Sequence, residues 1–158
     1  MTKYDWLLLG HLLAAFMLVS GAVVAGTLHF LATRRARPSE VALLLGLVRA
    51  AVPIVGVGSV AVLVFGLWLV HEAGFGFGDA WIGAAIVLWL ISMALAGPAG
   101  KRLRHARELA ERLAGEGDEP SAELHRAVAD RTALVMNYAS FACLVAILVR
   151  MIFKPGAG

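Results

Sequence analysis

Four uncharged apolar runs dominate the sequence, and each is long enough to cross a bilayer as a helix. They cover residues 6–33, 50–70, 80–99 and 132–149. A hydrocarbon core of about 30 Å needs about 20 apolar residues in helical form. A helix also satisfies its own backbone hydrogen bonds, and the runs lack the alternation of barrel strands. We therefore predict an all-α, polytopic membrane protein built as a four-transmembrane-helix bundle.

The composition excludes an ordinary soluble protein. Hydrophobic residues make up 60% of the chain and charged residues 16%, whereas about a quarter of a soluble domain is charged. One cysteine, Cys143, excludes a disulfide framework. The first run is too long for a secretory signal and ends in an arginine cluster, so we expect it to stay in the mature protein. Residues 1–158 are interpreted as a single integral membrane domain.

Lysine and arginine are concentrated in two of the connections, which predicts the orientation. Short connections rich in these residues stay in the cytoplasm. The basic residues following the first and third runs are Arg34, Arg35, Arg37, Arg49, Lys101, Arg102, Arg104, Arg107, Arg112, Arg126 and Arg131. We expect a bacterial cytoplasmic (inner) membrane protein with the N- and C-termini outside. No basic stripe with interleaved aromatic residues indicates a nucleic-acid partner.

The connection 100–131 is predicted to form a cytoplasmic helical hairpin. Residues 101–114 place charged pairs such as Arg104 and Glu108 at helical spacing. This segment is either a helical extension of the third span or a helix on the membrane surface. Glycine and proline then interrupt it, and Ser121 is suited to cap a second short helix. We favour basic residues lying against anionic lipid over a platform for docking proteins.

Two histidines lie within the first run, where ionisable groups are costly and therefore of functional interest. His29 follows His11 by eighteen residues, which is five helical turns, so both lie on one face. That face is rich in small residues, which allow close helix packing. Both side chains are predicted to point into the bundle. They are about 27 Å apart along the helix, too far to share a metal ion.

His11 is the candidate cofactor ligand. It could hold a haem b iron together with His71, which ends the second run near the same membrane face, or alone. Copper is the runner-up, since imidazole suits it, but Met17 lies about 120° away from His11 on a helix. The structural alternative is that His11 hydrogen-bonds a neighbouring helix and His71 ends its helix at the interface.

Other polar and small residues within the runs have simpler interpretations. Asn137, Tyr138 and Ser140 are expected to form interhelical hydrogen bonds. Arg49 is expected to extend its charge to the membrane surface. Three glycines of the second run predict close helix packing, and they are Gly56, Gly58 and Gly66.

Short motifs give the chain a family resemblance. They are His11 within Trp6-Leu-Leu-Leu-Gly-His-Leu-Leu, Arg49 with Pro53, and Gly66-Leu-Trp68. With these motifs the chain resembles an uncharacterised bacterial family of four-helix integral membrane proteins, a domain of unknown function. That family is similar to the membrane domain of copper-resistance protein D and to the four-helix protoporphyrinogen oxidase. The resemblance implies haem binding by His11.

The resemblance does not extend to the oxidase's lysine near the second helix. No lysine occurs between Lys3 and Lys101, so protoporphyrinogen oxidation is not implied. We also find no hydrolytic triad or zinc-ligand spacing, and no catalytic residue is predicted.

Three functional hypotheses remain open. The first is a haem b or copper-associated membrane redox protein. The second is a non-catalytic assembly subunit that binds another membrane protein, or a second copy of itself, through its small-residue faces. The third, transport of a small solute or metal, is weaker because no acidic residue lies within any span.

Overall fold

The computed structural model describes residues 2–76 and 78–153, and its regular elements are all helical. They are α1 (Lys3–Ala32), α2 (Pro38–Glu72), α3 (Ala80–Gly115), α4 (Ala122–Val128) and α5 (Arg131–Phe153). In this part of the chain, four helical segments are long and apolar enough to cross a membrane: α1, α2, α3, and α4 taken together with α5. The predicted all-α class and the four spans are confirmed.

Side chains at the helix ends account for where two of the helices begin. The hydroxyl of Thr2 accepts a hydrogen bond from the Asp5 amide at 3.3 Å, and the Asp5 carboxylate accepts from the Thr2 amide at 2.6 Å. This reciprocal pair caps α1. Ser121 caps α4 as predicted, since its hydroxyl accepts from the Leu124 amide at 3.4 Å. Both caps bind backbone amides of the first helical turn, which have no carbonyl partner within the helix.

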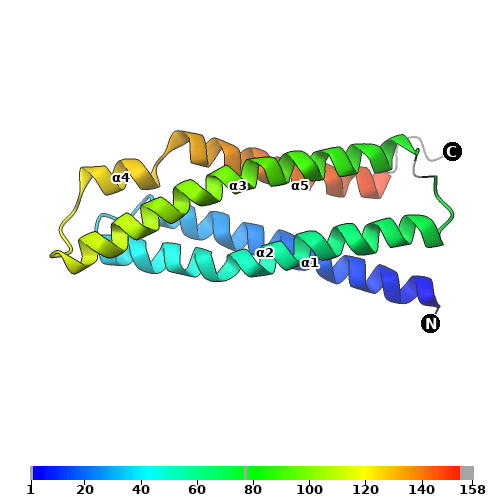
Figure 1. Ribbon diagram of the computed structural model, residues 1–158, viewed down its shortest axis with the longest axis horizontal. Helices are drawn as coiled ribbons and strands as arrows, with labels where there is room; N and C mark the ends of the chain where they lie inside the picture. Colours follow the sequence, from blue (N-terminus) through cyan, green and yellow to red (C-terminus); the bar gives the residue numbers. More distant parts are fainter. Residues whose placement is uncertain (1, 77, 154–158) are drawn as a thin grey trace.

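The long helices form two pairs. In Figure 1, α1 lies along α2 and α3 lies along α5; α2 also contacts α3, whereas α1 and α5 make few contacts. The first pair is close because Gly58 has no side chain: a Cβ there would lie 2.8 Å from the Leu18 amide nitrogen. The close packing predicted from Gly58 is thus confirmed. A Cβ at Gly56 would have nothing within 4 Å, so Gly56 does not serve that packing.

Polar side chains join the helices inside the apolar layer. The hydroxyls of Ser92 in α3 and Ser140 in α5 are 2.8 Å apart, and both residues are buried. The Trp89 indole N–H donates to the Ser59 hydroxyl at 3.0 Å, which joins α3 to α2. The interhelical bond predicted for Ser140 is therefore confirmed. Tyr138 is instead 59% exposed, facing outward.

The outer surface of the bundle is apolar. In the most hydrophobic window of each spanning segment, between 17% and 22% of the residues are buried inside the protein. Large side chains such as Phe16, at 73% exposure, and Val60, at 61%, lie on the outside. A water-soluble monomer rarely carries so continuous an apolar surface. These side chains therefore face lipid.

Two helices continue well beyond the apolar runs. Helix α2 begins at Pro38, far ahead of residue 50, because proline suits the first helical turn and 38–49 is also helix-forming. Helix α3 passes through Pro98 and ends at Gly115, so the hairpin's first segment is an extension of the third span. Gly97 and Pro98 therefore do not end that helix. A proline within a spanning helix is tolerated because neighbouring groups satisfy the freed carbonyl.

The extended segments form a separate core, which we call the basic-end core. It contains buried side chains from α1, α2, α3 and α4: Ala32, Val41, Leu45, Val48, Ala106, Leu109, Ala110, Leu124 and Val128. A 35-residue helix such as α2 is about 52 Å long, while the hydrocarbon core is about 30 Å thick. Helix α2 is therefore longer than the hydrocarbon is thick, and the basic-end core joins the hairpin to its first turns.

Candidate functional site

A cavity of about 480 Å³ lies in the half of the bundle where α1 begins and α5 ends. All four long helices contribute to its wall, and most of the wall is aliphatic or aromatic. The polar side chains that line it include His11 and Tyr4. Its volume is in the range of about 300–1,000 Å³ that is typical of small-molecule sites. The cavity can thus accommodate an apolar ligand beside one imidazole.

The imidazole of His11 is held in one orientation by α2. Its Nδ1 lies 3.1 Å from the backbone oxygen of Val62. A carbonyl oxygen only accepts, so Nδ1 donates the proton, and in the neutral ring Nε2 carries the free lone pair. The predicted inward orientation of His11 is confirmed. The hydrogen bond also matches the arrangement that orients histidine ligands in metal sites, where one nitrogen donates to a carbonyl and the other binds.

The structure does not bring His71 to the same cavity. His71 is exposed on the last turn of α2 and is not among the cavity-lining residues. It follows Val62 by nine residues. Nine residues are two and a half helical turns, so His71 lies on the opposite face of the helix from Val62. The proposed pair of axial histidines gains no support from this placement.

The methionines bear on the copper alternative, and Met17 lies where its offset of about 120° from His11 on the helix predicts. Met17 lies outside the cavity wall, whereas Met151 of α5 contributes to it. Nothing local marks Met151 as a cavity residue, because its place in the wall depends on how α5 packs against the other helices. Within residues 2–76 and 78–153, no three His, Cys, Asp or Glu side chains form a metal-binding group.

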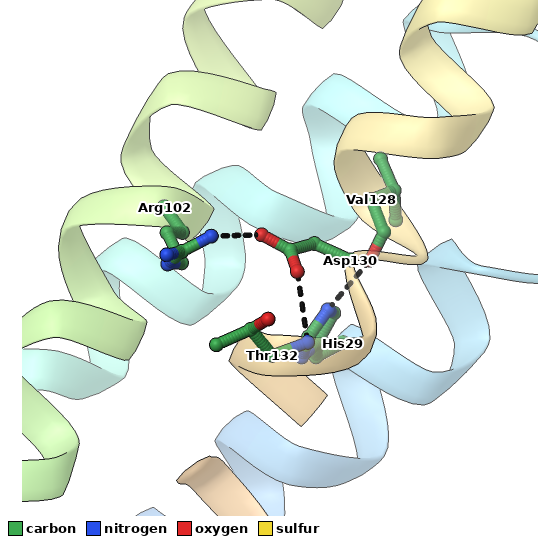
Figure 2. A network of polar contacts seen from close by, with 5 residues as sticks. All are labelled: His29, Arg102, Val128, Asp130 and Thr132. Carbon is green, nitrogen blue, oxygen red and sulfur yellow. Dashed lines mark hydrogen bonds and ion pairs between the residues drawn. The ribbon is translucent and has the colours of Figure 1, made fainter. Parts of the chain in front are cut away.

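His29 is committed to a structural contact at the other end of α1. Figure 2 shows its buried ring beside the end of α4, where Nε2 donates to the Val128 backbone oxygen at 3.0 Å. Close by, Arg102 of α3 pairs with Asp130 at 2.6 Å. Asp130 also accepts from the Thr132 amide at 2.8 Å and so caps α5. These contacts fasten the α4–α5 junction to α1 and α3.

A second contact fastens the connection between α3 and α4 to α2. The Asp118 carboxylate accepts from the Ser39 hydroxyl and from the Ser39 amide, each at 2.7 Å. These two hydrogen bonds, led by the hydroxyl, hold the pKa of Asp118 below its ordinary value. Asp118 has a φ of 59°, a left-handed conformation that aspartate tolerates in turns. Sequence reasoning missed this residue because its partner is 79 positions away.

Fold and cavity together define an integral membrane protein of the four-helix class with a ligand-sized interhelical space. The family described as "Predicted integral membrane protein (DUF2269)" matches residues 6–155, and the chain belongs to that family. No curated protein and no solved structure matches the chain. The similarity to copper-resistance protein D and protoporphyrinogen oxidase stays a prediction from the sequence motifs.

Proposed function

We propose that this protein binds haem b in the cavity, where His11 would hold the iron, and serves as a membrane redox protein. The observation that carries the proposal is the imidazole of His11, fixed through Nδ1 to the Val62 carbonyl and lining an apolar cavity. Haem iron is commonly held by one histidine whose second nitrogen is hydrogen-bonded.

The residues present fit such a group. The wall is predominantly aliphatic and aromatic, as suits a flat apolar macrocycle. Within it, Trp89 already donates its N–H to Ser59, so it needs no partner from the ligand. Bound haem would supply one-electron transfer. His11 would hold the group, and the surrounding side chains would exclude water and tune its potential.

Copper is the second candidate, favoured by one observation. The thioether of Met151 and the imidazole of His11 line the same cavity. Thioether and imidazole are both suitable copper ligands, the thioether for Cu(I) in particular. Among residues 2–76 and 78–153, no group of three histidine, cysteine or acidic side chains that could hold a metal ion is present.

The orientation in the membrane belongs to the same proposal. The α1–α2 connection and the stretch 101–131, which carry most of the basic residues, lie at the end of the bundle opposite the start of α1 (Figure 1). Since short basic connections stay in the cytoplasm, this end faces the cytoplasm of a bacterial inner membrane. The cavity then lies in the outer half of the bilayer, and both termini are outside.

An absorption spectrum tests the haem assignment. The protein is purified in detergent from haem-replete cells, together with His11→Ala and, as control, His71→Ala, whose parent side chain is exposed and outside the cavity wall. We expect a Soret band in the parent and in His71→Ala and its loss in His11→Ala. A band of equal height in all three overturns the assignment.

Metal analysis of the same samples tests copper. Copper retained by the parent and lost from His11→Ala supports the second candidate. A parent protein without haem or copper overturns both and favours the assembly-subunit hypothesis, which crosslinking in native membranes then examines.

A further inference from the structure

The cavity has an incomplete wall on one side. Helix α1 packs along α2 and α3 along α5, but α1 and α5 make few contacts with each other. The large hydrophobic side chains that line the cavity and are exposed all come from these two helices: Leu12 at 56%, Ile152 at 72%, Tyr4 at 40% and Leu148 at 39%. Lining residues of α3, such as Trp81 at 4% and Ala85 at 6%, are buried. The cavity therefore opens between α1 and α5.

The end of the cavity that faces water is more tightly packed. Val70, Trp81 and Ile82 form a buried cluster with Phe75 and Met151 packed against it. The rings of Phe75 and Trp81 meet edge-to-face, with centroids 5.5 Å apart. These contacts place apolar side chains between the cavity and the aqueous phase.

The opposite end is closed by interhelical contacts. Ser92 and Ser140 bond to each other between α3 and α5. Gly58 brings α2 against the backbone of α1 at Leu18. The Trp89 indole N–H bonded to the Ser59 hydroxyl then joins the two pairs, from α3 to α2.

We infer that the cavity takes its ligand from the bilayer, sideways between α1 and α5, and that the ligand is a membrane-dissolved amphiphile with an uncharged apolar body. The opening is continuous with the lipid-facing surface, since neighbouring residues such as Leu13 and Val149 are exposed there. A charged body is excluded because moving it through hydrocarbon is costly. The inference concerns access to the cavity and does not depend on haem as the ligand.

A photoactivatable phospholipid tests this route. The protein is reconstituted in vesicles of phosphatidylethanolamine and phosphatidylglycerol that carry a diazirine on the acyl chain, and labelled residues are mapped by mass spectrometry. Ile86 lines the cavity, and its neighbour Val87 is 54% exposed on the outside. The ratio of labelling at Ile86 to that at Val87 then measures access. In protein freed of any bound haem we expect Ile86 to be labelled; such a protein labelled at Val87 alone overturns the inference.

Matched variants locate the opening. Leu12→Trp and Leu148→Trp enlarge lining side chains at the opening and are expected to lower the ratio several-fold. Leu13→Trp is the control, because Leu13 is also 56% exposed but does not line the cavity. Equal ratios in all variants overturn the proposed route. Leu12→Ala, which widens the opening without adding bulk, should raise the ratio and covers the case in which the larger variants do not fold.

The labelling also separates this inference from the haem proposal. Once any haem has been extracted from both proteins, His11→Ala should leave the labelling ratio within the range of the parent. A protein that lacks haem but admits the lipid chain supports lateral access and rejects the haem assignment. A protein with haem whose Ile86 is never labelled, even after the haem is extracted, does the reverse.

Discussion

Gly66 of α2 leaves the space that the imidazole of His11 occupies. A Cβ at position 66 would lie 3.1 Å from His11 Cε1 and 3.4 Å from Nδ1. The same ring is bound through Nδ1 to the Val62 carbonyl one turn earlier on α2. The orientation of the candidate ligand therefore depends on a missing side chain as well as on a hydrogen bond.

Gly66→Ala should displace the ring and weaken its bond to Val62. Overpacking of this kind costs about 1 kcal/mol or more, and any Soret band should shift or weaken because the ligand is reoriented. The free energy of unfolding of the protein in detergent and its absorption spectrum are the quantities to measure. Gly56→Ala is the control on the same helix, since a Cβ there meets nothing within 4 Å. It should be neutral or stabilising by about 0.5–1 kcal/mol; equal behaviour of the two variants contradicts the prediction.

Gly58→Ala should be the most damaging glycine substitution of the three. The added Cβ would lie 2.8 Å from the Leu18 amide nitrogen and 3.1 Å from the Ala14 carbonyl oxygen. Backbone cannot rotate away as a side chain can, so α1 and α2 must separate, at a cost of about 3 kcal/mol. Thermal unfolding in detergent measures the loss. A melting temperature equal to that of Gly56→Ala would show that the helices are not in this contact.

Much of the fold was predictable because membranes impose simple length and polarity requirements. The four runs became the four spans, Ser121 caps α4 as predicted, and the charge pairs of 101–114 lie in α3. The early start of α2 was missed because a search for uncharged runs stops at Arg49, although Pro38 suits a first turn. Charged residues show where an apolar run ends, but the helix can continue beyond them.

The site was less predictable than the fold. The inward face of α1 follows from helical periodicity, which correctly predicted that His11 and His29 point into the bundle. Their partners, Val62 and Val128, are backbone carbonyls with no sequence signature. The cavity itself lies between two helix pairs and is lined by all four long helices, a relationship between segments that local patterns do not encode.

The contact between Asp118 and Ser39 predicts a local dependence on pH. The folded pKa of Asp118 lies below 3.8, because the Ser39 hydroxyl and amide both donate to the carboxylate. The stabilisation is therefore present above about pH 4 and is lost as the pH falls through the lowered folded pKa. Hydrogen exchange at the start of α2, corrected for intrinsic rates, should show protection that declines only in this acidic range.

Asp118→Asn provides the matched test of that pH dependence. The amide keeps the shape but has no titration, so protection at the start of α2 should become independent of pH between about 2 and 6. Protection at neutral pH should also be lower, since a charged acceptor forms the stronger hydrogen bond. A variant that still loses protection in acid would assign the titration to another carboxylate.

The two contacts that hold the α4–α5 junction should differ in strength. His29→Ala leaves the Val128 carbonyl without its donor beside a buried residue, which costs about 1–3 kcal/mol. Arg102→Ala removes an ion pair whose arginine side chain is 47% exposed, and such pairs contribute about 0–1 kcal/mol. Hydrogen exchange should therefore rise more in α4 of His29→Ala, with amides around Ser140 unchanged in both variants. The reverse order would mean that charge, and not the buried histidine, fastens the hairpin to the membrane bundle.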